Sequence, residues 1–331
     1  MLHERGTART ALQSGGLALV TIGLVTWNSA SDVVRCLDGI RAQQHQAIEL
    51  LVGDNASADG TRALLEARTT PGERRYFDTN LGFAGAHNAL IRQSRGAYYL
   101  TLNPDVVLDA GFVGALVEAL AAAPRAGSAS GKLRRAEPAG VLDSTGIVMH
   151  RSQRHFDRGA DEIDRGQYDV PGEVFGVSGA AGCYRRAMLD DVAIDGEVFD
   201  EDFFAYREDA DLAWRAQLLG WDALYVPRAT AAHVRRVTPE RRSALPATIN
   251  RYGVRNRFLL RLKNQTAGQA ARFAVPGMAR DLQVIGYVLA REWGSIPGLV
   301  DVVRLLPRMM AKRRAVMARR DRRRSLDRWF T

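Results

Sequence analysis

Three clusters of polar side chains in the sequence could bind a nucleotide or a cation, and each follows directly after a short apolar run. Their members are carboxylates, amides and hydroxyls, which can bind a base, a ribose or a metal ion. The clusters are Thr26 and Asn28, then Asp54, Asn55 and Ser57, and then Asn103 and Asp105. A carboxylate such as Asp105 can hold Mg²⁺ or Mn²⁺ against a diphosphate, because hard cations prefer oxygen ligands. The alternative for 103–105 is an ordinary turn, since Asn, Pro and Asp all favour turns.

A fourth cluster is acidic and lies at the start of a predicted helix. Glu208, Asp209 and Asp211 place three carboxylates within four residues, next to aromatic residues between 203 and 206. Apolar neighbours raise the pKa of a carboxylate toward the range that a general base needs. The alternative is structural, because acidic residues in a first turn also complement the helix dipole. On these residues alone both interpretations stay open.

His233 and Gly82 are the remaining candidates. His233 follows a predicted strand at 223–226, and a lone histidine is more often structural than a metal ligand. Gly82 lies at 80–85, which we predict to be a loop whose glycine spacing is too loose for a phosphate-binding motif. Neither residue identifies a site by itself.

The elements that must position these clusters alternate between strand and helix. Apolar runs predict buried strands at 17–25, 48–53, 75–77 and 98–102. Helical patterns between them cover 32–44 (with Ser31 as the N-cap), 61–68 and a stretch ending at 94. This alternation predicts an α/β fold, with a mostly parallel sheet and helices on both faces. Ligands bind such sheets beyond the carboxyl ends of the strands, which is where the three polar clusters fall.

The second half of the chain is more mixed. A Gly- and Ala-rich buried run, 175–184, precedes the acidic cluster, whose helix extends to Leu219 and stops at Gly220. From about residue 248 the pattern is helical and amphipathic, with breaks predicted at 276–277 and 297–298. We therefore expect a flexible tail at 1–15, an α/β domain at 16–240 and a basic, helical extension at 241–331.

The net charge of +9 is concentrated at one end of the chain. Residues 304–331 carry eleven Arg and Lys against two Asp, an excess equal to that of all 331 residues. The rest is neutral, which argues against nucleic acid as a partner of the α/β domain. Apolar clusters between 284 and 306 alternate with arginines, and the chain ends in Trp329, Phe330 and Thr331. This pattern predicts an amphipathic tail on an anionic membrane surface, with a solvated helical face or an oligomer contact as the alternative.

Two further features bear on location. The apolar runs at 17–25 and 282–290 are shorter than a membrane span, and we predict that the first is a buried strand rather than a signal-peptide core. Cys36 and Cys183 lie in apolar stretches, which is typical of reduced, intracellular cysteines. We expect a cytoplasmic protein that associates peripherally with the inner face of the cell membrane.

Taken in order, the polar blocks resemble family 2 of the inverting, nucleotide-sugar-dependent glycosyltransferases, which have the GT-A fold, and within it the rhamnosyltransferase branch. The resemblance covers about residues 17–240, and its most specific part is the block 199–212. The other matching blocks are 25–28, 52–61, 80–88 and 102–105.

The resemblance implies a role for each candidate residue. Asp54 is expected to pair with the base of the donor nucleotide, with Thr26 and Asn28 near the base and ribose. Asp105 takes the second position of the family's Asp-X-Asp metal motif, whereas the first position is Asn103 here, which leaves one carboxylate instead of two. The remaining assignments are His233 as a second metal ligand, Asp209 as catalytic base with Glu208 as the fallback, and Asn55, Ser57, Gly82 and Asn103 as further donor-binding residues.

The same resemblance implies substrates and a cofactor. The expected donor is a nucleotide-diphosphate sugar, with dTDP-rhamnose first, and the expected acceptor is a hydroxyl of a glycan or a polyprenyl-diphosphate-linked glycan of the cell envelope. The cofactor would be Mg²⁺ or Mn²⁺. UDP-hexose and galactofuranose donors remain open. A nucleotidyl-transfer enzyme is the other alternative, but it would need a basic, Gly-rich loop after the first strand.

Overall fold

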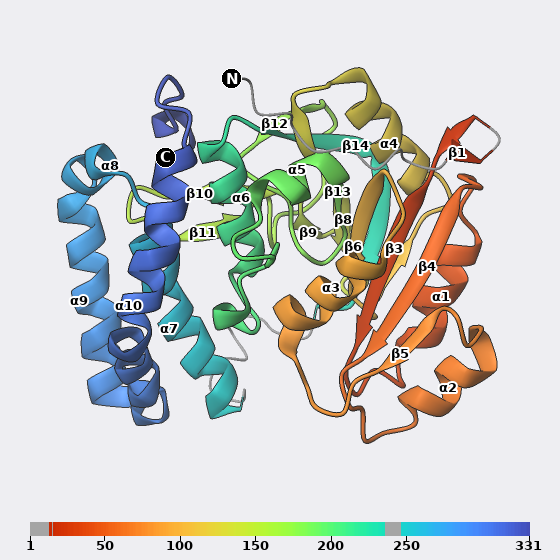
Figure 1. Ribbon diagram of the computed structural model, residues 1–331, viewed down its shortest axis with the longest axis horizontal. Coiled ribbons are helices and arrows are strands. Elements are labelled where there is room, and N and C mark those ends of the chain that lie inside the picture. Colours follow the sequence, from red (N-terminus) through yellow and green to blue (C-terminus); the bar gives the residue numbers. More distant parts are fainter. Residues whose placement is uncertain (1–12, 15, 236–245) are drawn as a thin grey trace, which may run out of the picture.

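A mixed, curled sheet forms the centre of the computed structural model, which describes residues 13–14, 16–235 and 246–331 (Figure 1). Within these residues the sheet has the strand order β12-β14-β8-β13-β6-β3-β4-β5, with β7 on β14 and β9 on β8. Its strands are β3 (Val20–Thr26), β4 (Ile48–Asp54), β5 (Arg74–Tyr76), β6 (Tyr98–Leu102), β7 (Val106–Leu108), β8 (Ala126–Arg135), β9 (Leu142–Ser144), β12 (Gly172–Val174), β13 (Gly182–Arg185) and β14 (Asp222–His233). The predicted α/β fold is confirmed.

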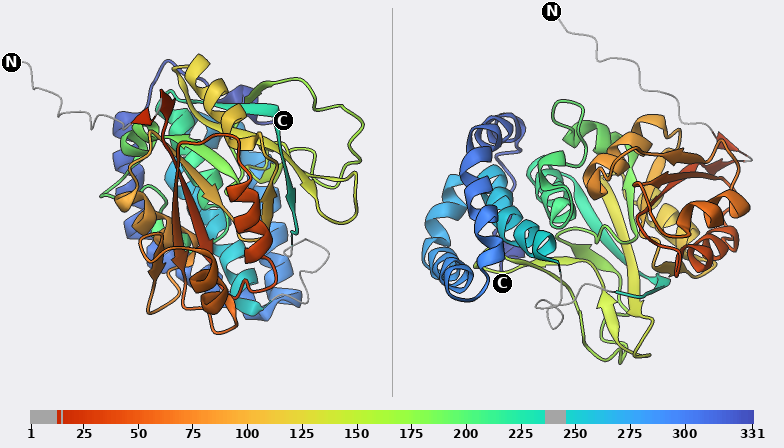
Figure 2. Two further views of the ribbon diagram at one scale, coloured as in Figure 1. Left: turned by 90° about the vertical axis from the view of Figure 1, so that its right-hand side faces the viewer. Right: turned by 90° about the horizontal axis from the view of Figure 1, so that it is seen from below.

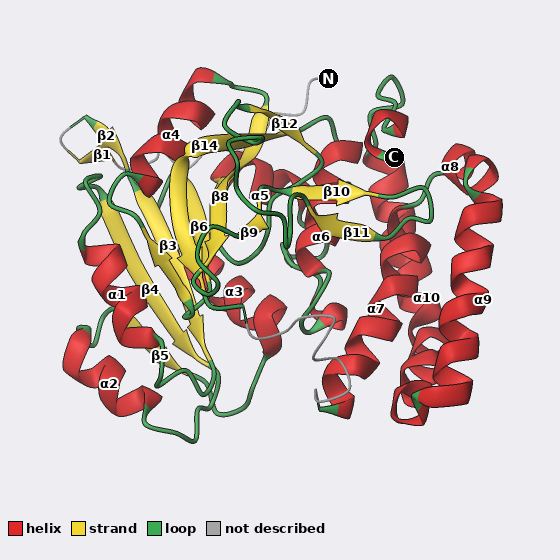
Figure 3. Cartoon of the chain, turned by 180° about the vertical axis from the view of Figure 1, so that it is seen from behind, coloured by secondary structure: helices red, strands yellow, loops and turns green. Residues whose placement is uncertain are grey.

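The predicted parallel part is the unit β5-β4-β3-β6, in which all three pairs are parallel. The sheet becomes mixed beyond it, because β13 runs antiparallel between β6 and β8. Figure 3 shows helices packed along both faces of the sheet. They are α1 (Val33–Arg41), α2 (Thr61–Arg68), α3 (Gly82–Gln93), α4 (Phe112–Ala122), α5 (Arg186–Val192) and α6 (Glu208–Leu218).

Several predicted boundaries differ from the structure. Strand β3 begins at Val20, and the preceding residues form a separate pair, β1 (Gln13–Ser14) with β2 (Leu17–Ala18), so this part of the predicted tail is ordered. Asp32, not Ser31, occupies the N-cap position of α1. The stretch 82–85 is not a loop, because α3 already begins at Gly82. The final strand is also longer than predicted, so that His233 is the last residue of β14.

The C-terminal region contains α7 (Ala247–Asn264), α8 (Ala267–Arg272), α9 (Ala274–Arg291) and α10 (Ile296–Arg319). The break predicted at 276–277 is wrong: Pro276 is the third residue of α9, and a proline is tolerated in the first turn, where its missing N–H has no helical partner. Pro297 instead lies at the start of α10. The boundary predicted at residue 240 lies outside the described residues.

The C-terminal helices form a layer at one end of the molecule, with α6 between them and the sheet (Figures 1 and 2). One apolar core joins this layer to the rest, because Met309, Val316 and Phe330 are buried with Phe175 and Trp214. The prediction that the terminal aromatic residues belong to a membrane-facing tail is therefore wrong for Phe330, which stacks on Phe273. The burial of an aromatic ring also accounts for the docking of the last residues.

Much of the positive charge of the tail is paired with carboxylates of the α/β domain. Arg319 contacts Asp191, Arg324 contacts Asp222 and Arg328 contacts Glu173. The charge asymmetry of the sequence is thus in part an internal complementarity. None of the described helices has the length and the apolar content to cross a bilayer.

A buried ionic network connects α10 and α7 to the segment before α6. Lys312 of α10 binds Asp200 (2.5 Å) and Asp202 (2.9 Å), and Lys263 of α7 binds Asp200 (2.6 Å) and Asp211 (2.7 Å). Burial alone would raise the pKa of Asp200, but the two ammonium groups hold it well below its usual range. Each buried charge has an opposite partner, as burial requires.

Candidate active site

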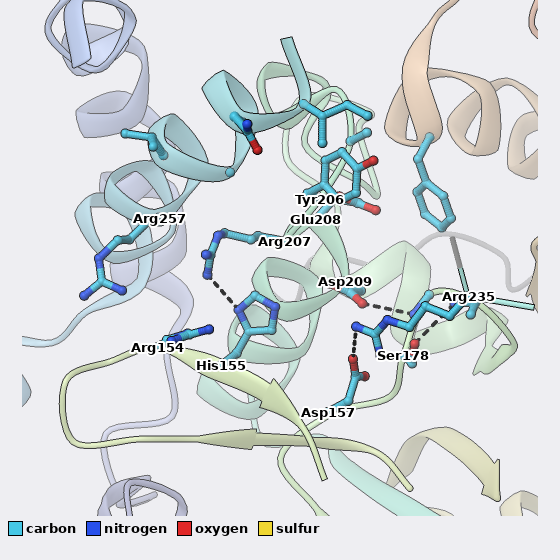
Figure 4. Close-up of a pocket in the computed structure, with 18 of the residues that line it drawn as sticks. Arg154, His155, Asp157, Ser178, Tyr206, Arg207, Glu208, Asp209, Arg235 and Arg257 are labelled. Carbon is cyan, nitrogen blue, oxygen red and sulfur yellow. Dashed lines mark hydrogen bonds and ion pairs between the residues drawn. The ribbon is translucent and has the colours of Figure 1, made fainter. Parts of the chain in front are cut away.

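A pocket of about 910 Å³ lies between the edge of the sheet and the C-terminal helices (Figure 4). The sheet side contributes Asn103, Asp105 and His233, and α6 contributes Glu208 and Asp209. The opposite wall consists of α7 and α9, which supply a mixture of apolar and basic side chains. These are Ile249, Asn250, Gly253, Val254 and Arg257 of α7, and Arg280, Gln283, Val284, Tyr287 and Val288 of α9.

Asp209 is held in a defined orientation at the start of α6. Its Oδ2 accepts a hydrogen bond from the backbone N–H of Gly179 (3.1 Å), and its Oδ1 accepts one from its neighbour Ala210 (2.7 Å). Burial and the nearby carboxylate of Asp157 raise its pKa, although the backbone hydrogen bonds oppose the shift. A half-buried carboxylate with a raised pKa is suited to accept a proton.

Glu208 is more deeply buried than Asp209 and makes fewer hydrogen bonds through its side chain. Its side chain is only 6% exposed, and among the described residues its Oε2 has no hydrogen-bond partner. Burial, followed by repulsion from Asp209, raises the pKa of Glu208 well above its usual value. Burial therefore favours the neutral form of Glu208 more than that of an exposed carboxyl group, and Glu208 lies beside a carboxylate that reaches the pocket.

The backbone before this pair is left-handed at Phe204, Tyr206 and Arg207, with φ of 64°, 70° and 74°. Such angles are uncommon for non-glycine residues and need support from the surroundings. Asn256 of α7 supplies it, because its fully buried side-chain amide donates to the carbonyls of residues 203, 205 and 206 at 2.8–2.9 Å. Arg255 donates to the carbonyls of residues 202 and 203.

Asn256 and Arg255 were not singled out from the sequence. Asn256 could have been found as an amide side chain on the buried face of a helix. A buried polar group needs hydrogen-bond partners, so such a residue is a candidate for holding another segment in place. Its partners lie about fifty residues earlier in the chain, which no local pattern reveals.

Asp105 and His233 lie next to each other at the sheet end of the pocket. The His233 Nε2 is 3.4 Å from an oxygen of Asp105, and its Nδ1 is 2.7 Å from Asp143. Burial alone would lower the pKa of His233, but hydrogen bonds to Asp105 and Asp143 outweigh it and raise the pKa to about 9.

This pair fits a divalent cation that also binds a diphosphate. An imidazole nitrogen and a carboxylate oxygen face the pocket, and Asp143 fixes the other ring nitrogen, as second-sphere carboxylates do in metal sites. The described part of the chain contains no group of three or more His, Cys, Asp or Glu residues that could hold a metal by itself. The remaining ligands would have to come from substrate or water, and His233 would have to lose its proton to ligate.

The predicted nucleotide-binding residues form a separate cluster beyond the carboxyl ends of β3 and β4. Asp54 is fully buried there, and its two oxygens accept hydrogen bonds from Thr26, Ser57 and Arg62. Asn28 bonds across to this cluster, since its backbone N–H donates to the Ser57 hydroxyl (2.9 Å). None of these residues lines the described pocket.

Helix α3 connects the nucleotide cluster to the pocket. Asn55 donates to the carbonyl of Gly82 (3.0 Å), and the adjacent Phe83 lines the pocket. Gly82 has a φ of +70°, and a Cβ there would collide with the carbonyl of Phe204. The structure thus brings Asn103, Asp105, Glu208, Asp209 and His233 into one pocket, and it places Thr26, Asn28, Asp54, Asn55, Ser57 and Gly82 in a neighbouring cluster.

The site thus combines a carboxylate at a helix start with polar side chains at the carboxyl edge of a parallel sheet unit, where ligands of such folds bind. The chain belongs to glycosyl transferase family 2, whose model matches residues 21–192. The protein is therefore a glycosyltransferase.

Relatives and solved structures agree with this family. The chain is 29% identical over 231 residues to N-acetylglucosaminyl-diphospho-decaprenol L-rhamnosyltransferase of Mycobacterium tuberculosis, covering 63% of this chain and 74% of the relative. Its fold is similar to that of S. aureus TarS 1–349 in complex with UDP-GlcNAc, with a TM-score of 0.56, 17% identity, and 91% and 88% of the two chains covered. It is also similar to the mannosyltransferase PcManGT from Pyrobaculum calidifontis in complex with GDP-Man and Mn²⁺, with a TM-score of 0.54, 18% identity, and 91% and 86% covered. The expected GT-A fold is confirmed.

Proposed function

We propose that this enzyme transfers rhamnose from dTDP-rhamnose to a hydroxyl of a polyprenyl-diphosphate-linked glycan in the synthesis of cell-envelope polysaccharide. The observation that carries the proposal is the placement of Asp209 in one pocket with the Asp105–His233 pair, 3.4 Å apart. The Mycobacterium tuberculosis relative, whose name specifies rhamnose and a decaprenol-linked acceptor, supports the choice of substrates.

The reaction proposed is a single displacement with inversion. Asp209 accepts the proton of the acceptor hydroxyl while that oxygen bonds to the anomeric carbon of the donor sugar. The bond from the anomeric carbon to the diphosphate oxygen breaks on the opposite face, and the nucleoside diphosphate leaves with the electron pair. Thr26, Asn28, Asp54, Asn55, Ser57, Gly82 and Asn103 are the proposed donor-binding residues.

A divalent cation, Mg²⁺ or Mn²⁺, is proposed at Asp105 and His233. When bound, it would neutralise the charge that develops on the leaving diphosphate. The protein's own contribution at this position is orientation: Asp143 holds the His233 ring, and the turn at 103–105 places the carboxylate at the end of β6.

A donor screen tests the proposed function. The full chain is incubated with dTDP-rhamnose, UDP-GlcNAc, UDP-galactofuranose or GDP-mannose, with Mn²⁺ or with EDTA, and the thermal shift and nucleotide release are measured. We expect dTDP-rhamnose to give the largest shift and nucleotide release that EDTA abolishes. A thermal shift and nucleotide release with a UDP-sugar alone would show that the proposed donor, dTDP-rhamnose, is wrong. Full activity in EDTA would overturn the metal proposal.

We also propose that α9 and α10 rest on an anionic membrane, where a lipid-linked acceptor would be found. Leu282 of α9, Trp293 between the two helices and Val303 of α10 are exposed by 72, 70 and 70%. Large apolar side chains this exposed are a common feature of interaction sites. The exposed arginines Arg304 and Arg308 follow Val303 on α10 and suit anionic headgroups. The contact that we propose therefore lies on α9 and the first half of α10, not on the last residues of the chain.

Cosedimentation with phosphatidylglycerol vesicles tests the membrane proposal. The triple variant Leu282→Ser/Trp293→Ser/Val303→Ser is expected to lose most of its vesicle binding while its donor-induced thermal shift is unchanged. The matched control is Val170→Ser, which removes a side chain that is 78% exposed on the α/β domain. Equal binding by the triple variant and the parent would exclude this face as the membrane contact.

A further inference from the structure

The backbone carbonyls of residues 202–207, the segment that leads into α6, all accept a hydrogen bond. The N–H of Ala84 in α3 donates to the carbonyl of residue 204 (3.1 Å), and the N–H of Asp211 in α6 donates to that of residue 207 (2.9 Å). The carbonyls of residues 202, 203, 205 and 206 accept from α7, through the side chains of Arg255 and Asn256. Most of the hydrogen bonds that hold this segment therefore come from one helix of the C-terminal region.

Arg255 fixes the direction in which the amide of Asn256 points. Its Nε donates to the Asn256 Oδ1 (2.9 Å), so the amide nitrogen of Asn256 faces the carbonyls of residues 203, 205 and 206. Tyr252, one turn earlier on α7, stacks on Phe204 with ring centroids 5.0 Å apart, and the Arg255 guanidinium lies over the Tyr252 ring (4.8 Å). Tyr252, Arg255 and Asn256 thus act on the segment together, and we call them the α7 clamp.

The clamped segment determines where Asp209 lies. Arg207 occupies the N-cap position of α6 with a φ of 74° and a ψ of 0°, whereas a helix N-cap usually has an extended backbone. Asp209 follows as the second residue of α6. A backbone rotation at residue 206 or 207 would therefore move the Asp209 carboxylate away from the Gly179 N–H, with which it forms a hydrogen bond of 3.1 Å.

The backbone of this segment is strained at the point where it matters for the pocket. Residues 204, 206 and 207 are left-handed although they are Phe, Tyr and Arg and not glycine. Such strain persists only where the surroundings enforce it, and it concentrates at functional sites. Here the α7 clamp supplies the enforcing contacts, and residues 205–209 line the pocket. A small change in the clamp would thus be felt directly at the proposed base.

We infer that Asn256 is a positioning residue of the reaction, whose amide holds the segment 203–207 so that the Asp209 carboxylate faces the acceptor hydroxyl. The inference rests on the proposed function, in which Asp209 is the base. It gives α7 a part in the transfer step in addition to its place in the pocket wall.

A double-mutant cycle with Asp209→Asn tests the inference, with dTDP-rhamnose as donor and N-acetylglucosaminyl-diphospho-farnesol as acceptor. A residue that acts through Asp209 has no further effect once the base is gone. We expect Asn256→Ser to lower the kcat of the parent about tenfold, because a small misplacement of a reacting group is costly, but to change the residual kcat of Asp209→Asn by less than about twofold. Each kcat is referred to the number of donor-binding sites from calorimetric titration, and the KM for the donor should not change.

Asn264→Ser is the matched control. Asn264 is also a fully buried asparagine of α7, but its amide donates to the Asp211 carboxylate (2.7 Å) and to the carbonyl of Leu260 (3.1 Å). Its loss lowers stability without removing a hydrogen bond to the carbonyls of residues 202–207, so kcat per donor-binding site should change by less than about twofold. An equal fall of kcat in Asn264→Ser and Asn256→Ser would show that any loss of α7 packing lowers turnover, and it would overturn the inference.

Tyr252→Leu is the second variant, for the case in which Asn256→Ser does not fold. It removes the ring that stacks on Phe204 and leaves the buried amide of Asn256 in place. We expect a several-fold fall in kcat that disappears in the Asp209→Asn background. The inference alone fails if either variant lowers kcat by the same factor in both backgrounds, or leaves the kcat of the parent unchanged. Full activity of Asp209→Asn by itself would instead refute the proposed function, and the inference with it.

Discussion

Asp209→Asn is expected to fold, to bind the donor and to lose transfer activity by at least about 100-fold, the usual size of a lost general base. The asparagine keeps the shape of the side chain, and its amide oxygen can still accept from the Gly179 N–H. What it cannot do is take the acceptor proton. The measurements are kcat for transfer and the donor-induced thermal shift, which together separate chemistry from binding.

Glu208→Gln is the matched control for this prediction. The neutral form of Glu208 is favoured in the folded protein, because burial raises its pKa well above the usual value. A neutral amide therefore changes little, and we expect activity within several-fold of the parent. The opposite pattern, with activity lost in Glu208→Gln and kept in Asp209→Asn, would exchange the two roles.

The pH dependence follows from the direction of the Asp209 shift. A base must be unprotonated to act, so kcat should fall as the pH drops through the raised pKa of Asp209. The stability effect has the same origin. A carboxyl group whose pKa is raised by folding destabilises the folded state above that pKa, and the penalty vanishes below the unfolded value. Asp209→Asn should therefore be more stable than the parent at neutral pH.

Lys312→Met is expected to cause the largest loss of stability, about 3 kcal/mol in the free energy of unfolding. The ammonium group contacts three carboxylates, and its removal leaves Asp200 and Asp202 with too little positive charge in a buried place. For a chain of this size the corresponding drop in Tm is roughly 4 °C. Thermal unfolding followed by circular dichroism at pH 7 measures it.

Arg308→Gln provides the comparison on the same helix. Arg308 also contacts Asp202 (3.1 Å), but its side chain is 60% exposed, and exposed ion pairs contribute at most about 1 kcal/mol. A Tm change in Lys312→Met no larger than that of Arg308→Gln would show that the network does not support the fold.

The parts of the fold that were predicted correctly depend on local pattern. The apolar runs that precede Thr26, Asp54 and Asn103 are short, so their strand character and the polar residues that follow can be identified without tertiary information. The acidic block at 208–211 was identified as a helix start for the same reason. Its role in the reaction stays a prediction.

The parts that were missed depend on contacts between distant segments. Residues of α7 share a core with residues as far apart in the chain as Ile147 and Phe330, and Asn256 has partners fifty residues away. The basic tail was interpreted from its charge and from the alternation of apolar clusters with arginines. The way α10 docks on the α/β domain decides whether one of its arginines faces lipid or a carboxylate such as Asp191. The periodicity of the sequence does not reveal how a helix docks.

At the left-handed residues Phe204, Tyr206 and Arg207, the substitutions that would raise stability differ from those that would preserve activity. Each non-glycine residue in such a conformation costs about 1–3 kcal/mol, which glycine would relieve. Yet Tyr206 and Arg207 line the pocket, and glycine would remove the side chains that do so. Laboratory evolution toward heat resistance alone would thus drift toward an inactive protein at this loop, so variants should be selected for turnover and for heat resistance together.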